Sequence, residues 1–332
     1  MLYKVKEMLP KGYKLVYVTE FGSTLYGTNS ENSDKDYKGI FIPPIDDLIL
    51  GKASENFKFN TGNSNSKNSK NDIDIELWSV NKFFKLLKNG ETGSIDLLFS
   101  MFREDTILFE DKAFTSKIKE NYKLFLSKNM KAFIGYCLGQ ASKYGIKGSR
   151  YGDLLKFRQE LDNFKDEDTT SFVIKMLELT KDYEVNNFKY IKVIEKEDKK
   201  YLSVLGKLAI ENLTIKELKE RTDNQLKQYG DRTKLALEGV DWKALSHAVR
   251  VLFEMVEIIE TEFLVFPLKG RGYLKQIKYN SKVENLDYIL ELISSQLKMI
   301  EKLLEQSKLP EGISKSNLKK IDELLLSIVK GL

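Results

Sequence analysis

The sequence predicts an α+β protein, in which a small α/β unit (residues 1–111) is followed by a mainly α-helical part (residues 112–332). Up to about residue 110, short strand-like segments alternate with helices and glycine turns, whereas apolar residues beyond residue 112 recur mostly at helical spacing. The 332 residues contain only five prolines and 20 glycines but 19 Phe and 16 Tyr. This composition indicates a folded, helix-rich chain rather than a linker-rich one.

The first part begins with a short helix expected at residues 2–9 and a buried strand at residues 13–21. Gly22 and Gly27 then indicate a turn. A second strand is expected at residues 36–42, and it should end at Pro43-Pro44 because proline cannot continue a hydrogen-bonded ladder.

The polar segment 60–71 is expected to form a flexible surface loop between two strands. Residues 72–78 (DIDIELW) then alternate with period two, which predicts a strand with its isoleucines and leucine on one face and Asp72, Asp74 and Glu76 on the other. Ser79 is expected to cap the following helix, and Gly90 to end it.

The second part shows helical periodicity over six stretches: 114–145, 151–184, 214–236, 241–262, 284–307 and 315–330. One interruption near residues 189–206 is expected to be a β-hairpin.

Several chemistries are excluded by composition. The single cysteine, Cys137, cannot form an internal disulfide, and the single histidine, His247, rules out zinc sites built on several His or Cys ligands. No phosphate loop of the G-x-x-x-x-G-K-[ST] type is present. We find neither a signal segment nor an apolar stretch of about 20 residues, and therefore expect a cytoplasmic protein without membrane contact. The net charge of +5 is compatible with phosphate ligands but does not by itself indicate nucleic-acid binding.

The most informative segment is FGSTLYGTNSENSDKDYKGI, residues 21–40. Gly22-Ser23 ends one expected strand and Asp34-x-Asp36 enters the next. Carboxylates two residues apart in an extended chain share one face at a separation of about 7 Å, which suits shared ligation of two divalent cations. Gly22 lets the backbone approach a triphosphate, and Ser23 can donate a hydrogen bond to it.

These residue types are also common in ordinary turns, and an S-D-x-D segment occurs by chance in surface loops. The glycine–serine turn about a dozen residues earlier, and the carboxylate of Asp74 in a third strand, favour the catalytic interpretation.

The order G-S-x-x-Y-G followed by S-D-x-D-x-x-G-I-F-I-P-P resembles the nucleotidyltransferases of the DNA polymerase β superfamily, and within it the RNA-repair-pathway polymerase-β-like group. The motifs here are Gly22-Ser23, Tyr26-Gly27, and residues 33–36 and 39–44. The similarity extends to residues 78–98, 239–250 (GVDWKALSHAVR) and 265–268, and it is specific around residues 22–44 and 239–250. Residues 89–94 (NGETGS) lack the Asn-Pro expected there, which concerns loop shape rather than the metal site.

The resemblance implies that Asp34, Asp36 and a third carboxylate bind two Mg²⁺ or Mn²⁺ ions, with Gly22 and Ser23 on the triphosphate of an NTP such as ATP. Asp74 is the preferred third ligand. Glu76 lies on the same strand face and is the main alternative, and Asp72 is a weaker one.

Basic residues of the helical part provide further candidates for nucleotide binding. Lys143, Lys147 and Arg150 interleave with tyrosines and could contact a base or phosphates, although a solvated helix face in a lysine-rich chain is an equal alternative. His247 and Arg250 lie three apart on one helix face. A lone histidine is more often structural, whereas a guanidinium matches phosphate geometry.

The resemblance further implies that the helical part closes one side of the nucleotide cleft, and that NMP is transferred to a hydroxyl with release of pyrophosphate. An RNA (tRNA) 3′ end is the leading acceptor. A protein hydroxyl or a small molecule is the rival acceptor, and a catalytically inactive nucleotide sensor is the rival function.

Overall fold

The computed structural model describes residues 1–61, 72–140, 147–179, 188, 190–196, 199–227, 242–279 and 286–331. The chain forms two compact units, the first made of Met1–Gly139 with Leu245–Leu332 and the second of Gln140–Ala244. The α+β class predicted from the sequence is confirmed, since one mixed sheet and its helices are followed by a mainly helical chain.

The predicted division at residues 111/112 differs from these units. The reason is that the chain returns to its beginning: the C-terminal helix α15 (Lys315–Lys330) packs on α4 (Val80–Lys88). The Lys88 ammonium lies 2.8 Å from the Asp322 carboxylate across this contact. Helical periodicity shows that residues 315–330 bury one face, but it does not show which surface covers that face.

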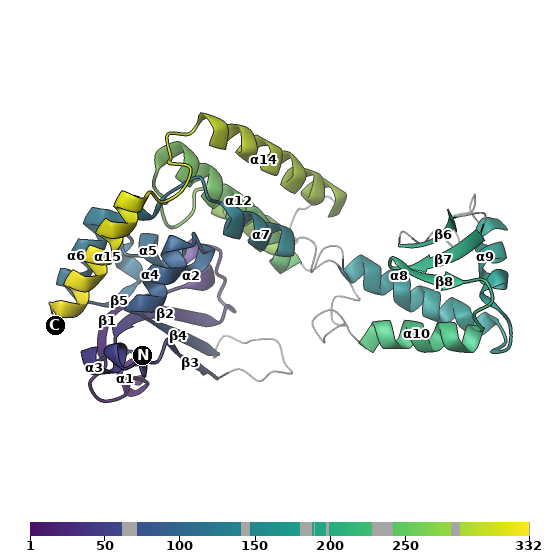
Figure 1. Ribbon diagram of the computed structural model, residues 1–332, viewed down its shortest axis with the longest axis horizontal. Helices are drawn as coiled ribbons and strands as arrows, with labels where there is room; N and C mark the ends of the chain where they lie inside the picture. The colour runs from purple at the N-terminus through teal and green to yellow at the C-terminus, as the bar shows by residue number, and fades with distance from the viewer. Residues whose placement is uncertain are drawn as a thin grey trace. The chain divides into compact units, whose positions relative to one another are not determined.

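A five-stranded sheet forms the centre of the first unit, with the strand order β3-β4-β2-β1-β5 (Figure 1). Its strands are β1 (Lys14–Glu20), β2 (Lys35–Ile42), β3 (Asn56–Asn60), β4 (Ile73–Ser79) and β5 (Ile107–Glu110). The pairing of β2 with β4 is parallel, and the other pairings are antiparallel. The parallel pair matters for function because it brings the starts of β2 and β4 to the same edge.

Helices cover both faces of this sheet. Below it in Figure 1 lie α1 (Leu2–Glu7) and α3 (Ile45–Ile49). On the α1 side, Val5 packs into an apolar cluster with residues that include Tyr37, Phe41, Ile75 and Leu77. The alternating residues of β2 and β4, which include Asp36, Lys38, Asp74 and Glu76, therefore point to the opposite face.

The remaining helices of residues 1–140 are α2 (Gly22–Tyr26), α4, α5 (Thr92–Ser100), α6 (Lys112–Asn121) and α7 (Lys131–Gln140). Ser79 caps α4 as predicted, its hydroxyl accepting a hydrogen bond from the Lys82 backbone N–H at 3.2 Å, and Gly90 follows the helix with φ +66°. The single helix predicted over 114–145 is divided by a 3₁₀ turn (Tyr122–Phe125) and an irregular stretch that contains Ser127.

The C-terminal segment of the first unit contributes α12 (Trp242–Thr261, its first residues assigned to the second unit), α13 (Arg271–Tyr279), α14 (Leu286–Gln306) and α15. Helices α12, α14 and α15 agree closely with the predicted stretches, whereas α13 was not predicted. Cys137 is buried and free.

The second unit combines α8 (Lys147–Glu160), α9 (Thr170–Leu179) and α10 (Ile215–Lys227) with a three-stranded antiparallel sheet. The sheet consists of β6 (Ile191–Lys196), β7 (Lys199–Val204) and β8 (Lys207–Ile210). The predicted hairpin is thus present as β6 and β7, and a third strand extends it. The predicted loop at 60–71 lies outside the described residues from 62 onward, although its flanks are the antiparallel strands β3 and β4.

Among the helices that the structure describes, none combines the length and the apolar character needed to span a bilayer.

Candidate active site

The turn between β1 and α2 is built against Asp36. Gly22, the first residue of α2, has φ +55°, a backbone conformation that glycine adopts without steric penalty. A Cβ at this position would lie 2.8 Å from the Asp36 Cγ and closer still to its Oδ2. The preceding Phe21 N–H also donates a 2.8 Å hydrogen bond to the Asp36 carbonyl oxygen. Glycine therefore allows the Gly22-Ser23 backbone to lie directly on the Asp36 carboxylate.

The carboxylates of β2 and β4 are brought together by strand register. In the parallel ladder Asp36 lies opposite Asp74, on strands about 4.8 Å apart. Asp34 precedes β2, where the Lys35 N–H donates to the Asp72 carbonyl oxygen at 3.0 Å. Partial burial, together with the negative charges of Asp34 and Asp72, raises the pKa of the Asp74 carboxyl. This edge of the sheet thus concentrates negative charge.

Glu76, the alternative third ligand, lies one pair further along the ladder, opposite Lys38. Its carboxylate lies 3.0 Å from the Lys58 ammonium and 3.6 Å from that of Lys38. Burial works against ionisation of Glu76, but the Trp78 indole and the two lysines outweigh it and lower its pKa. With its charge compensated in this way, Glu76 is less available to a cation than Asp74.

Lys38 is a site residue that the sequence interpretation missed. Its ammonium lies 4.1 Å from the Trp78 ring centroid and 4.6 Å from that of Phe21, so it combines an ion pair with cation–π contacts. Burial lowers the pKa of Lys38, although Glu76 opposes this effect. The sequence does contain a signal for Lys38 as a site residue, because it follows Asp36 by two residues and therefore lies on the same strand face.

The donor set matches the preference of Mg²⁺ and Mn²⁺ for oxygen ligands. Across the described ranges, no three Asp, Glu, His or Cys side chains already converge as ligands of one ion. The structure shows Asp36 and Asp74 facing each other across the ladder, with Asp34 close enough to shift the pKa of Asp74. It also shows Gly22 at a position where any larger residue would displace the Asp36 carboxylate. These three carboxylates remain the predicted ligands.

Ser23 supplies a second feature of the same turn. Its hydroxyl oxygen is buried and has no hydrogen-bond partner among the described residues. A buried hydroxyl without a partner is unfavourable by about 1–3 kcal/mol. The predicted role of Ser23, donation to a phosphate oxygen, would satisfy this group.

The close approach of Gly22 leads to a first prediction. Gly22→Ala should reduce catalytic activity about a hundredfold, because the new methyl group must displace the Asp36 carboxylate and small displacements of reacting groups carry effects of that size. Gly51→Ala is the matched control, since Gly51 also has a positive φ (+65°) but an added Cβ there would meet no atom within 4 Å. Both variants should lose about 1–2 kcal/mol of unfolding free energy from the backbone conformation, measured by urea unfolding. Equal activity of the two variants would contradict the assigned role of Gly22.

A buried ionic cluster lies behind the turn and consists of Tyr26, Asp96, Arg250 and Glu254. The Tyr26 hydroxyl donates to Asp96 Oδ2 at 2.7 Å, and Arg250 Nη1 donates to the same oxygen at 3.2 Å. Arg250 also pairs with Glu254, four residues later on α12, and its guanidinium carbon lies 4.1 Å from the centre of the Tyr26 ring. The cluster thereby connects α12 to α2, the helix that begins at Gly22.

This placement argues against the predicted contact between Arg250 and the nucleotide. The side chain of Arg250 is only 6% exposed, and its guanidinium pairs with two buried carboxylates. A guanidinium held in this way stabilises the protein interior and positions α2 instead of facing a ligand. Asp96 and Glu254 were not predicted, although a lone acid within an apolar helical run, as in Ile95-Asp96-Leu97-Leu98, is a usable signal of a buried carboxylate.

One guanidinium cannot neutralise two ionised carboxylates. Burial raises the pKa of Glu254 to about 8, although the charge of Arg250 lowers it, and burial likewise raises the pKa of Asp96. We therefore assign one proton to this carboxylate pair near neutral pH.

This assignment predicts a pH dependence of stability. Between about pH 4.5 and 8 the unfolded chain releases the Glu254 proton while the folded protein retains it, so the free energy of unfolding should fall as pH rises. Glu254→Gln should remove this fall, which is on the order of a few kcal/mol, and should be more stable than the wild type at pH 9. Glu260→Gln, on an exposed position of the same helix, is the control. Parallel unfolding profiles of wild type and Glu254→Gln would contradict the assignment.

The other predicted nucleotide-binding residues are placed as follows. His247 lies on α12 and is half-buried. Lys143 lies outside the described residues, as do the side chains of Lys147 and Arg150, whose backbone belongs to α8. Their predicted roles, and that of His247, remain predictions.

The loop that leads from α2 to Asp34 is held by α13. The Thr28 carbonyl oxygen accepts hydrogen bonds from Lys278 Nζ at 3.0 Å and from the Tyr279 hydroxyl at 3.3 Å. Near the same, C-terminal end of α2, Arg103 donates to the Thr24 and Leu25 carbonyl oxygens at 2.9 and 2.7 Å. These contacts fix the short helix whose first residues form the site.

Comparison with known proteins agrees with this arrangement. The family model described as the RNA repair pathway DNA polymerase beta family matches residues 4–156, which include the whole carboxylate site. A protein of Enterobacteria phage T4, described as an uncharacterized 38.9 kDa protein in the nrdC-mobD intergenic region, is 36% identical over 280 residues, covering 80% of this chain and 82% of the relative. The fold and the site therefore define a protein of the DNA polymerase β type. The chain belongs to the RNA repair pathway DNA polymerase beta family.

Among solved structures, a nucleotidyltransferase-like protein from Exiguobacterium sibiricum 255-15 aligns with 100% of this chain and 90% of its own, at 11% identity and a TM-score of 0.25. A TM-score this low does not bear on the assignment of the site residues.

Proposed function

We propose that this protein is a metal-dependent nucleotidyltransferase that moves NMP from an NTP to the 3′ hydroxyl of an RNA and releases pyrophosphate. The observation that carries the proposal is the Gly22 turn, which lies directly on the Asp36 carboxylate while Asp74 faces Asp36 across a parallel ladder. A site for nucleotidyl transfer from an NTP needs such a combination of phosphate-binding backbone and cation-binding carboxylates.

Each group of the site has a role in this reaction. Asp34, Asp36 and Asp74 would hold two divalent cations, which, when bound, supply Lewis acidity to the attacking hydroxyl and to the pyrophosphate oxygens. The Gly22 backbone lies close to the phosphates, and the Ser23 hydroxyl donates to one of their oxygens. The acceptor oxygen forms a bond to the α-phosphorus as the bond to the bridging β-oxygen breaks, and the hydroxyl proton passes to a carboxylate of the cluster or to water.

The choice of RNA as acceptor is supported by the RNA repair pathway named in the description of the matching family. A tRNA 3′ end is one such acceptor. Binding of an RNA acceptor should weaken steeply with salt as phosphate contacts are lost.

The experiment that tests the function offers each of four α-³²P-labelled NTPs, with Mg²⁺ or Mn²⁺, to the protein together with total RNA and total protein. We expect label in RNA from at least one NTP, and none when EDTA removes the cations. Label in protein alone would place the acceptor in the protein class. An NTP that binds but is never transferred to any acceptor would contradict the proposed activity.

A further inference from the structure

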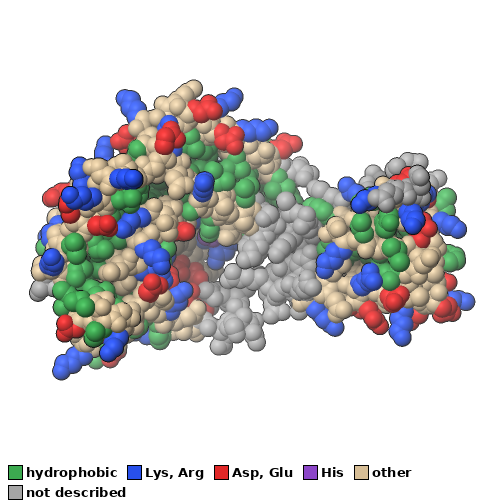
Figure 2. Space-filling view, in the orientation of Figure 1, with side chains coloured by type: hydrophobic (Ala, Val, Ile, Leu, Met, Phe, Trp, Pro, Cys, Tyr) green, Lys and Arg blue, Asp and Glu red, His purple; other side chains and the backbone are tan. Residues whose placement is uncertain are grey.

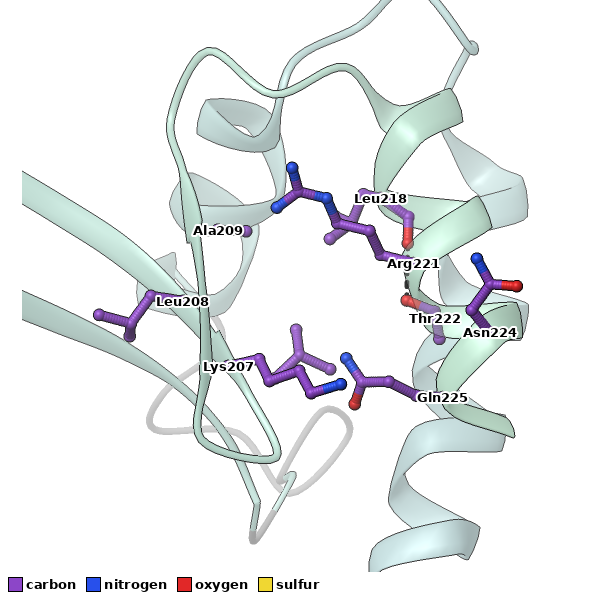
Figure 3. A pocket seen from close by; sticks show the side chains of 9 residues that line it. Lys207, Leu208, Ala209, Leu218, Arg221, Thr222, Asn224 and Gln225 are labelled. Atoms are coloured by element: carbon purple, nitrogen blue, oxygen red, sulfur yellow. Dashed lines mark hydrogen bonds between the residues drawn. The ribbon is translucent and has the colours of Figure 1, made fainter. Parts of the chain in front are cut away.

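A pocket of about 330 Å³ lies in the second unit, between β8 and α10 (Figure 3). Its apolar wall is formed by Val204, Ala209 and Leu218, and its polar lining by Lys207, Arg221, Thr222, Asn224 and Gln225. Leu208 also borders the pocket, but its side chain points away from it in Figure 3. None of the described residues that line the pocket is acidic. The volume is at the lower end of the range for small-molecule sites, which is roughly 300–1,000 Å³.

Three polar side chains reach into this pocket. Figure 3 shows Lys207 extending across it toward α10, the Gln225 amide directed back toward Lys207, and Arg221 extending toward Ala209. Asn224 points away from the others in the same view. The Thr222 hydroxyl is already engaged, since it donates to the Leu218 carbonyl oxygen at 2.7 Å.

Among the residues that the structure describes, the two cations of the pocket have no acidic partner in an ion pair, as is also true of Lys216 and Lys227 on α10, but unlike those two they line a pocket. Arg158, Lys200 and Lys219 each form an ion pair with an acidic residue at 2.6–2.9 Å. Within the described part of the chain, no ion pair or hydrogen bond involves the side-chain nitrogens of Lys207 or Arg221.

The nearest candidate partner of Arg221 is engaged elsewhere. Glu217, one helical turn earlier, accepts hydrogen bonds from the Thr214 N–H at 3.1 Å and from the Thr214 hydroxyl at 2.9 Å, as the capping residue of α10. The charge of Arg221 contributes to the lowered pKa of Glu217, but the two Thr214 hydrogen bonds have the larger effect. The guanidinium of Arg221 therefore acts on this carboxylate only through its charge, and the exposed side chain leaves its N–H donors accessible.

Gln225 gives the pocket a fixed neutral group. It is only 8% exposed, and burial of this kind restricts the freedom of its side chain. Two cations beside an amide donor and an apolar wall match a phosphate group attached to a nucleoside, because guanidinium and ammonium groups bind phosphate oxygens and the wall receives the sugar or base.

On the face seen in Figure 2, the basic residues are dispersed. Figure 2 shows Lys and Arg side chains interspersed with Asp and Glu over the visible face, without one broad basic patch there. A defined pocket is therefore a better candidate than general surface charge for holding a phosphate.

We propose that this pocket binds a phosphate-bearing nucleotide unit of the acceptor RNA, with Lys207 and Arg221 on the phosphate and Gln225 as an additional hydrogen-bond donor. The inference rests on the proposed function for its choice of RNA over a free nucleotide. RNA and a free nucleotide both contain a nucleoside phosphate, and binding of that group by the pocket does not depend on catalysis.

The test measures binding of the full chain to a fluorescein-labelled single-stranded RNA of 20 nucleotides, by anisotropy over a series of salt concentrations. Lys207→Gln/Arg221→Gln should weaken binding about tenfold or more and reduce the magnitude of the salt slope by about 0.7, as expected for the loss of one neutralised phosphate on a single strand. Gln225→Leu should weaken binding while leaving the salt slope unchanged, because it removes no charge.

The matched control is Lys216→Gln/Lys227→Gln, which removes the same charge from exposed positions of α10 that do not line the pocket. It should bind RNA within about twofold of the wild type. Identical weakening by the control and the pocket variant would overturn the proposal, as would RNA binding that neither pocket variant alters. Circular dichroism of all variants verifies that they are folded.

A second arm titrates AMP in place of RNA. Weakening of RNA binding, with or without weakening of AMP binding, supports the proposal. Weakening of AMP binding alone would overturn the assignment to RNA and identify a free nucleotide as the ligand of the pocket. Repeating the RNA titration with Asp34→Asn/Asp36→Asn separates the pocket from the catalytic proposal, because RNA binding through the pocket should persist when transfer is lost.

Discussion

Asp36→Asn is expected to lower the rate of NMP transfer by more than about a hundredfold, because loss of even an outer-shell contact of a metal site typically lowers affinity or activity 10–100-fold and Asp36 is a proposed direct ligand. Asparagine keeps the size of the side chain but not its charge, so the Gly22 turn should keep its shape. Calorimetric titration with Mg²⁺ should show weaker binding in parallel.

Stability separates this effect from misfolding. Asp36→Asn removes one negative charge from a cluster in which Asp34 and Asp72 already raise the pKa of Asp74, so its free energy of unfolding should equal or exceed that of the wild type. Asp46→Asn, at an exposed position of α3, is the control and should leave activity and Mg²⁺ binding unchanged. A fully active Asp36→Asn protein would remove Asp36 from the catalytic assignment.

The second large effect is on stability. Arg250→Met should lower the free energy of unfolding by about 3–5 kcal/mol, because it leaves the negative charge of the buried Asp96–Glu254 pair without a counter-charge. Asp96 is 1% exposed and Glu254 is fully buried, so neither can be solvated in place. Urea unfolding at pH 7 measures the loss.

Two further variants test the cause of this loss. Lys243→Met, at an exposed position of α12, should change stability by less than about 0.5 kcal/mol. Adding Asp96→Asn and Glu254→Gln to Arg250→Met should restore a large part of the lost stability, since the uncompensated charges are then removed. A direct contact between Arg250 and the nucleotide would produce the reverse pattern: normal stability and weakened NTP binding.

The carboxylate site illustrates what periodicity can predict. The alternation of residues 72–78 places Asp74 and Glu76 on one face of a strand, and the structure has that strand as β4. Which of the two acids is the third ligand depends on the strand beside β4. The parallel register, which puts Asp74 opposite Asp36 and Glu76 opposite Lys38, joins segments about 40 residues apart and has no local signal in the sequence.

Arg250 shows the complementary difficulty. Its helix is predicted correctly, and an arginine on a helix near a family-like motif is a reasonable phosphate ligand. Whether that arginine faces a ligand or the interior depends on Asp96, which lies 154 positions away along the chain. Helical spacing identifies a buried face but not the polar groups that the face meets.

The helix breaks within 114–145 and 151–184 were missed for a different reason. Apolar residues continue at helical spacing through both stretches, while polar turn residues such as Ser127 and Asn163 end helices only when tertiary contacts favour it. At Asn163 the chain leaves a 3₁₀ turn (Leu161–Asn163) before α9 begins. Propensity alone does not decide between a long helix and two short ones.

The central claim is that this site transfers a nucleotidyl group, and the fates of α- and γ-³²P labels from one NTP test it most directly. The proposed reaction predicts α-label in the RNA acceptor and an equal amount of γ-label in pyrophosphate, with both lost in Asp36→Asn. Appearance of the γ-label in the acceptor would mean phosphoryl transfer instead. Release of the γ-label as inorganic phosphate, with no α-label in any acceptor, would mean simple hydrolysis, and either result would contradict the account.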